Sequence, residues 1–271
     1  MTADLDLRFL TDFLNAEVDR REGSLIKRVL QASVDHGMYG MNLLRTLYKQ
    51  IPETRCDNCG SCCHSVSIFS LEYHLIMRDL LTRMNPGQIR QTLNGVLHLD
   101  QRLVQKQGES RLRCAFRESE TRACVVHESR PFCCRLFGQR FENTPPECDH
   151  VVPLLPGASL TTSFVEDLQV KVMNNSEAHT PYEDLSPITF FPFEFWVFRY
   201  ALGPEKALQL YRSVLVPAST ALSRFWHEER RRHAEGCHPE EHNSGQDHAG
   251  RRPRFSPRLD GSEHIPDARK H

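Results

Sequence analysis

The stretch RCDNCGSCCHS, residues 55–65, is a dense run of regularly spaced cysteines. Two residues separate the first cysteine from the second and the second from the third, and the fourth follows at once: Cys56, Cys59, Cys62 and Cys63. A two-residue gap lets a tight turn aim two thiolates at one metal ion. Gly60 permits the positive φ that such a turn often needs, and backbone N–H groups of the turn can point at the sulfurs. Adjacent side chains diverge, so we expect Cys62 and Cys63 to face different sites or two sides of one cluster. The run predicts a metal site, with a redox disulfide pair or buried thiols as alternatives.

A second group of cysteines lies in CAFRESETRACVVHESRPFCCRLF, residues 114–137. Cys114 and Cys124 are ten positions apart, Cys134 is a further ten, and Cys148 follows fourteen positions later. The charged and small residues between the first two suit a hairpin turn. Nearly all cysteines of the chain therefore fall in one region.

Composition limits the function classes that remain. The chain has 271 residues and a formal net charge of -1, from 34 Lys and Arg against 35 Asp and Glu. This balance argues against a protein that coats nucleic acid and against an electrostatic membrane binder. The sequence has no run of about 18 apolar residues and no secretory signal pattern, so we expect a cytoplasmic protein without membrane insertion. In the reducing cytosol, ten cysteines favour metal binding or redox chemistry over disulfides.

Hydrophobic periodicity predicts a mainly α protein with minor β, in which a small cysteine-rich metal-binding domain is embedded in a helical scaffold. We divide the chain into an N-terminal helical segment (1–52), a cysteine-cluster metal-binding domain (53–150), a helical C-terminal region (151–232) and a disordered polar tail (233–271). The tail has too few apolar side chains to offset chain entropy. Seven aromatic residues crowd the stretch 190–200, where we expect core, with a pocket wall as the alternative.

Secondary structure inside the cysteine-cluster domain follows from the same pattern. Helices are predicted over residues 71–84 and 88–107, with Ser70 as the candidate cap of the first. Short strands are expected at Ser65–Phe69 and Cys124–His127.

Together the two cysteine groups resemble the YkgJ-type cysteine-cluster family, whose members are described as zinc- or iron-chelating domain proteins. The hallmark of that family is a CxxCxxCC run, which residues 56–63 match in full. The positions that match its second block are Cys114, Cys124, Arg130, Pro131, Cys134 and Arg135, followed by Cys148. His127 stands where the family has tyrosine, and Cys133 is extra. The resemblance covers about residues 53–150.

The resemblance implies a set of metal-binding thiolates: Cys56, Cys59, Cys62, Cys63, Cys114, Cys124, Cys134 and Cys148. Thiolates suit zinc, iron or iron–sulfur clusters, whereas calcium and magnesium prefer oxygen. Eight thiolates would complete two four-iron clusters or two zinc sites. The dense run, the scarcity of histidines beside it and nearby apolar residues such as Phe116 and Phe137 favour an iron–sulfur cluster; a zinc or iron ion is the alternative.

Four further residues are candidates for roles around the metal or against a substrate. Arg130 and Arg135 can hydrogen-bond a ligand sulfur or pair with a substrate carboxylate; the alternatives are that Arg130 holds the loop by bonding backbone carbonyls and that Arg135 forms a structural salt bridge. His64 and His127 are candidate ligands or proton donors, and otherwise ordinary histidines near the site. We expect Cys133 to be a small apolar filler, with a redox thiol as the alternative, and we expect no specific role for His150 or Cys237.

No catalytic residue is assigned, because the chain lacks nucleotide-binding, serine-hydrolase and HExxH motifs. A related cysteine pattern occurs in flagellin lysine-N-methylases, so an enzyme would be an iron–sulfur oxidoreductase or a modifying enzyme of that kind. The alternatives are a zinc-stabilised protein-interaction module and an iron or zinc carrier or sensor. We expect a protein or small-molecule partner of unknown identity, and no nucleic acid.

Overall fold

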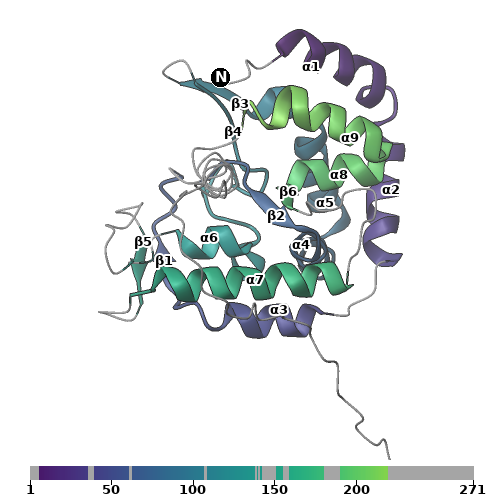
Figure 1. The fold of residues 1–271 in the computed structure, drawn as a ribbon. Helices are drawn as coiled ribbons and strands as arrows, with labels where there is room; N and C mark the ends of the chain where they lie inside the picture. The colour runs from purple at the N-terminus through teal and green to yellow at the C-terminus, as the bar shows by residue number, and fades with distance from the viewer. Residues whose placement is uncertain are drawn as a thin grey trace, which may run out of the picture.

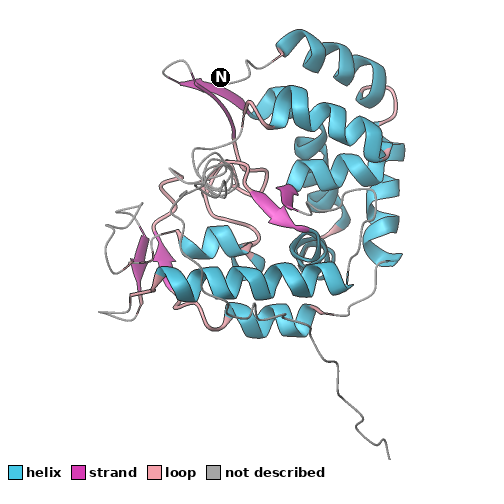
Figure 2. Ribbon diagram, viewed as in Figure 1, coloured by secondary structure: helices cyan, strands magenta, loops and turns pink. Residues whose placement is uncertain are grey.

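The computed structural model describes residues 6–35, 40–60, 63–106, 109–137, 139, 141, 151–154, 159–179 and 190–218. Most of these residues are helical, and the strands are short and paired in twos (Figure 2). The protein is therefore mainly α with minor β, as the sequence predicts. No helix among the described residues is both long and apolar enough to cross a membrane. The tail at 233–271, predicted to be disordered, lies outside this part of the chain.

The central helix is α4 (Ser70–Arg83), which packs into two hydrophobic cores. Leu71 and Leu75 of α4 belong to the smaller core, with side chains of α3 (Met41–Tyr48) and α7 (Thr162–His179). These two helices lie one against the other in Figure 1. The same core holds Phe132, so it reaches the second cysteine group.

The larger core contains the rest of the apolar side of α4 and is lined mostly by helices. They are α1 (Leu7–Phe13) with its continuation η1 (Leu14–Val18), α2 (Glu22–Asp35), α5 (Pro86–Leu97), α8 (Phe193–Leu202), α9 (Pro204–Leu210) and η5 (Tyr211–Leu215). In α8 every residue from Phe193 to Phe198 is buried, as expected for a helix that other elements surround. The expectation that the aromatic stretch forms core is confirmed.

Helix α5 begins two residues before the predicted start at residue 88, because Pro86 takes its first position and Asn85 caps it; it also ends earlier than predicted. Asn85 accepts a hydrogen bond from the N–H of Gln88 at 2.9 Å, and the Gln88 side chain accepts one from the N–H of Asn85 at 3.1 Å. The predicted end at residue 107 is wrong. The turn η2 (Leu99–Arg102) follows, and β3 (Leu103–Lys106) then pairs with β4 (Glu109–Leu112), so ladder bonds replace the bonds of a longer helix.

Two local predictions near the cysteines also need correction. The candidate cap Ser70 does not cap α4: its hydroxyl lies 2.8 Å from that of Ser176 in α7, and the Glu72 carboxylate accepts from the N–H of Phe69 instead. The strand expected at Ser65–Phe69 forms over its last residues as β2 (Ser67–Phe69), paired with β6 (Phe190–Pro192).

No strand forms at Cys124–His127. Cys124 makes a single bridge to Arg117. The N–H of His127 then bonds to the Cys124 carbonyl at 3.2 Å, which turns the chain into η3 (His127–Ser129). The short helix α6 (Phe132–Leu136) follows and carries Cys133 and Cys134.

Candidate metal centre

Five of the predicted thiol ligands line one cavity of about 90 Å³: Cys56, Cys63, Cys114, Cys124 and Cys134. We call this cavity the cysteine pocket. Apolar side chains complete much of its wall, among them Val66, Ile68, Ile76, Phe116 and Phe193. Cys59 is half-buried and is not part of the lining, while Cys62 and Cys148 lie outside the described residues. The structure thus gathers thiols that are far apart in the chain.

The first cysteine turn begins where β1 (Thr54–Cys56) ends. The N–H of Asn58 donates to the Sγ of Cys56 at 3.3 Å, and the N–H of Cys59 donates to the Asp57 carboxylate at 3.0 Å. Asn58 and Gly60 both have positive φ, at 62° and 82°. The expected left-handed glycine and the expected N–H pointed at a sulfur are both confirmed.

Arg117 holds this turn from the second cysteine group. Its guanidinium donates to the carbonyls of Asn58 and Cys59 at 3.4 and 3.3 Å. It also lies against Gly60, where a Cβ would be 2.2 Å from the Arg117 Cζ. Glycine is therefore required here by its backbone conformation and by the close approach of the guanidinium.

The second group forms the hairpin that its sequence predicts. The N–H of Val125 donates to the Phe116 carbonyl at 2.9 Å, and the N–H of Glu118 donates to the Ala123 carbonyl at 3.0 Å. The N–H of Cys114 donates to the Cys63 carbonyl at 3.1 Å, which joins the hairpin to the first cysteine group. The two groups therefore form one unit.

Three of the pocket's sulfurs accept a backbone hydrogen bond of the same kind, and two of these thiols have a raised pKa. Cys114 and Cys124 accept the N–H of the residue two positions later, as Cys56 does. Burial, together with nearby Cys134, raises the pKa of Cys124 to about 11, while the N–H of Val126 and the charge of Arg130 oppose the shift. Burial also raises the pKa of Cys114 well above its usual range, with Cys124 and Cys134 adding to the shift. These thiols keep their protons at neutral pH unless a cation replaces them.

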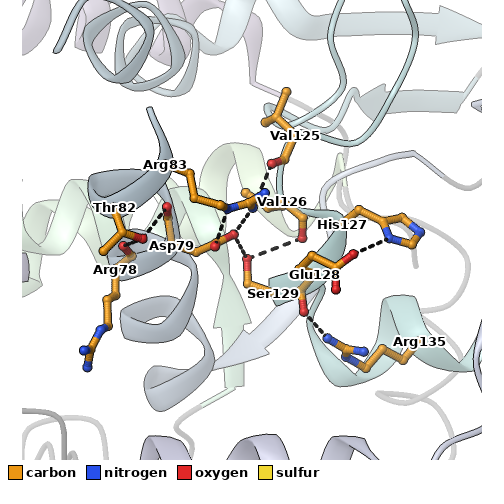
Figure 3. A network of polar contacts seen from close by, with 10 residues as sticks. All are labelled: Arg78, Asp79, Thr82, Arg83, Val125, Val126, His127, Glu128, Ser129 and Arg135. Carbon is orange, nitrogen blue, oxygen red and sulfur yellow. Dashed lines mark hydrogen bonds and ion pairs between the residues drawn. The ribbon is translucent and has the colours of Figure 1, made fainter. Parts of the chain in front are cut away.

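Helix α4 fixes the loop that follows Cys124 (Figure 3). Arg83 donates to the Val125 carbonyl at 3.1 Å, and the Ser129 hydroxyl donates to the Asp79 carboxylate at 2.5 Å. Arg135 donates to the Glu128 carbonyl at 2.5 Å. The loop is thus bonded to a helix before the cysteine and to a helix after it.

Glu72, also in α4, positions the helix that carries Cys134. Its buried carboxylate accepts hydrogen bonds from the N–H of Phe132 at 2.6 Å, from the N–H of Phe69 at 2.8 Å and from the Tyr48 hydroxyl. Burial raises the pKa of Glu72, and the three donors oppose that shift. This carboxylate joins the first turn of α6 to α3 and α4.

The four residues predicted around the metal divide into two groups. His64, His127 and Arg130 line the cysteine pocket. Arg135 does not: it donates to the carbonyls of Arg130 and Glu128, and its Cζ lies 4.4 Å from the centre of the Tyr48 ring. The sequence suggests that Arg130 holds the loop by bonding backbone carbonyls. In the structure Arg135 makes these bonds instead. Burial lowers the pKa of His127, and Arg130 lowers it further.

Of the two remaining cysteines, Cys133 and Cys237, the structure describes only the first. Cys133 is buried, and its thiol donates to the Ser67 carbonyl at 3.5 Å. It is not part of the pocket lining, which agrees with a small apolar filler. Cys237, like His150, lies outside the described residues.

Glu194 is a wall residue of the pocket that the sequence analysis missed. It is buried in α8 and accepts from the Ser65 hydroxyl at 2.5 Å and from Arg102 at 2.8 Å. Arg102 also donates to the Arg113 carbonyl, next to Cys114, at 2.7 Å. The sequence feature that could have indicated Glu194 is a single acid among seven aromatic residues, since a carboxylate that is buried there requires hydrogen-bond partners.

The described part of the chain gives an incomplete ligand set. No three of its His, Cys, Asp or Glu side chains are arranged to hold a single ion. Strand β1 pairs with β5 (Val151–Pro153), with Cys56 opposite Val151. Cys148 lies three positions before Val151 in the sequence, outside the described residues.

Residues 55–149 match a family model described as "CxxCxxCC: Putative zinc- or iron-chelating domain". This segment is similar to that family. The matched CxxCxxCC segment is about a third of the chain and contains all five cysteines of the pocket. No curated protein and no solved structure matches the chain. The α7–α9 region, which supplies Glu194, lies outside the match.

Proposed function

We propose that the CxxCxxCC segment binds iron or zinc through its cysteine thiolates, with an iron–sulfur cluster as the favoured form. The observation that carries this proposal is the convergence of five cysteines, from both cysteine groups, on one pocket with an apolar wall. Cys59, Cys62 and Cys148 complete the proposed set of eight ligands.

The chemistry of the donor set fits such a group. Sulfur is the donor that zinc, iron and iron–sulfur clusters share, and the pocket offers few competing oxygens. Backbone N–H groups donate to three of the sulfurs, which offsets negative charge on metal-bound thiolates. Apolar residues beside the sulfurs would shield a cluster from water, which supports iron–sulfur over an exposed ion.

When bound, an iron–sulfur cluster supplies electron transfer, so the proposal includes a redox or protein-modifying role. The chain's own part is to exclude water and to hold polar groups beside the thiols. Glu194 is fixed by Ser65 and Arg102, and His127 lies on the same wall as Arg130. A zinc ion in the same pocket would instead link the cysteine turn, the hairpin and α6, which is the basis of an interaction module.

Anaerobic purification followed by assay of iron, zinc and acid-labile sulfide per chain tests the proposal. Iron with matching sulfide and a brown absorption band is the expected result. Zinc without sulfide would refute the iron–sulfur form and support the structural ion. Absence of both metals from protein that also fails to take up either one on reconstitution would refute metal binding.

Neighbouring residues of α6 offer a matched pair of variants. Cys134→Ala removes a thiol of the pocket, whereas Cys133→Ala removes a buried thiol outside it. We expect Cys134→Ala to lose at least half of the bound metal and Cys133→Ala to keep it. Equal metal content in the two variants would exclude Cys134 as a ligand.

A further inference from the structure

A second cavity, of about 400 Å³, adjoins the cysteine pocket and shares Arg130 with it. We call it the polar cleft. Its charged lining differs from the apolar wall of the cysteine pocket, and it lies between α3, the start of β1 and the loop from η3 to α6. Four cationic side chains line it: Arg45, Lys49, Arg130 and Arg135.

In the described part of the chain, the acids that line the polar cleft are not paired with three of these cations. Asp79 accepts hydrogen bonds from Arg83 and from the Ser129 hydroxyl (Figure 3). The Glu128 side chain is 83 % exposed, and its carboxylate lies 3.7 Å from the His127 ring. Glu53 is exposed at the rim. Within the described residues, none of these acids forms an ion pair with Arg45, Lys49 or Arg130.

Arg130 has a hydrogen-bond donor that no group of the described residues satisfies. Its Nε is buried and has no hydrogen-bond partner. A buried guanidinium N–H without an acceptor is costly, so native proteins usually provide one from protein, water or ligand. Because Arg130 lines both cavities, an acceptor in the polar cleft would lie beside the cysteine pocket.

The remaining cations are arranged around the same space. Arg135 is held rigidly, since it bonds to the carbonyls of residues 128 and 130 and packs on the ring of Tyr48. Arg45 and Lys49 are four positions apart at the end of α3, so both project from one face of the helix. Together they make the cleft attractive to a small anion.

We propose that the polar cleft binds a small oxyanion, a carboxylate or phosphate group of a soluble ligand, with Arg130 as its main hydrogen-bond donor. A guanidinium presents N–H groups in a planar fork that matches both oxyanions. A ligand anchored in this way would extend from the cleft towards the thiols. The anion site does not depend on which metal, if any, the thiols hold.

Calorimetric titration of the purified full-length protein with sodium phosphate and with sodium succinate tests the proposal, at constant ionic strength set by sodium chloride. We expect at least one of the two anions to bind. Arg130→Gln should weaken that binding about tenfold, because a charge-assisted hydrogen bond is lost. The control Arg90→Gln removes an exposed cation of α5 that lines a different groove, and should leave the affinity unchanged.

The outcomes separate clearly. Succinate binding alone indicates a carboxylate ligand, phosphate binding alone indicates a phosphate ligand, and binding of both supports the shared oxyanion chemistry. No heat from either anion, or equal affinity in wild type and Arg130→Gln, would overturn the proposal. If circular dichroism shows that Arg130→Gln is unfolded, the double variant Arg45→Gln/Lys49→Gln replaces it, and an affinity loss below about threefold would overturn the proposal. Metal content, measured on each sample, distinguishes loss of the anion site from loss of the metal centre.

Discussion

Replacing Gly60 by alanine tests how the first cysteine turn is held. At φ 82° an alanine costs about 1–2 kcal/mol relative to glycine. The new Cβ would also lie 2.2 Å from the Arg117 Cζ, so the guanidinium must leave. Its two long hydrogen bonds, at 3.3 and 3.4 Å, are worth about 0.5–1 kcal/mol each. Gly60→Ala should therefore lower the free energy of unfolding by about 2–4 kcal/mol.

The assay is urea unfolding of the full chain followed by circular dichroism, with preparations of equal metal content. Gly95→Ala is the matched control, because Gly95 is inside helix α5 and its Cβ would meet nothing within 4 Å. That substitution should raise the free energy of unfolding by about 0.5–1 kcal/mol. In an Arg117→Ala background, Gly60→Ala should cost only the backbone strain, about 1–2 kcal/mol. A cost of Gly60→Ala that is within about 0.5 kcal/mol of zero, or that does not change when Arg117 is absent, would refute the reasoning.

Substitutions at three other residues test the surroundings of the cysteine pocket. Glu72→Ala leaves the Phe132 N–H and the Tyr48 hydroxyl without an acceptor and should lower the free energy of unfolding by about 3–5 kcal/mol in urea unfolding; Glu72→Gln, which keeps one oxygen, should cost less. Glu194→Gln removes the countercharge of Arg102, whose side chain is 11 % exposed, and should lower the free energy of unfolding by about 3 kcal/mol in the same measurement. Burial holds the pKa of His127 below its ordinary value. As pH falls below about 6.5, His127 therefore takes up a proton more readily in the unfolded chain than in the folded one, and the free energy of unfolding decreases. Unfolding of metal-free protein at about pH 7.5 and about pH 5.5 should show a smaller loss in His127→Asn than in wild type.

Each of these expectations has a contrary result. Equal stability of Glu72→Ala and Glu72→Gln would mean that the carboxylate does not organise the start of α6. A stability of Glu194→Gln equal to that of wild type would mean that the ion pair with Arg102 contributes nothing net. An unchanged pH dependence in His127→Asn would show that His127 titrates alike in both states.

Much of the site could be foreseen from local chemistry. The spacing of Cys56, Cys59 and Gly60 predicts a left-handed turn with an N–H on a sulfur, because only a few backbone conformations fit so short a gap. The hairpin between Cys114 and Cys124 likewise depends on hydrogen bonds between residues that are close together in the chain. Both features depend on residues close together in the chain.

Two predictions near the cysteines are wrong because other segments provide alternative hydrogen-bond partners. Ser70 satisfies the rule for a cap, yet its hydroxyl meets Ser176 from α7 and Glu72 takes its place. Residues 103–106 continue a helical pattern, yet they pair with 109–112. Ser176 is a distant partner, whereas β4 is the neighbouring strand of a hairpin; in each case the observed hydrogen bonds replace those that the local pattern predicts.

The amino-acid sequence was sufficient for the α-rich class, the two cysteine groups and the similarity to a CxxCxxCC domain, since these depend on periodicity and on spacing along the chain. Only the tertiary structure brought Arg117 onto Gly60, Glu194 onto the pocket wall and Arg130 between two cavities. These contacts join residues separated by dozens of positions. They form because burial of the aromatic helix α8 and of α4 draws the polar groups together, and burial then requires each charge to find a partner.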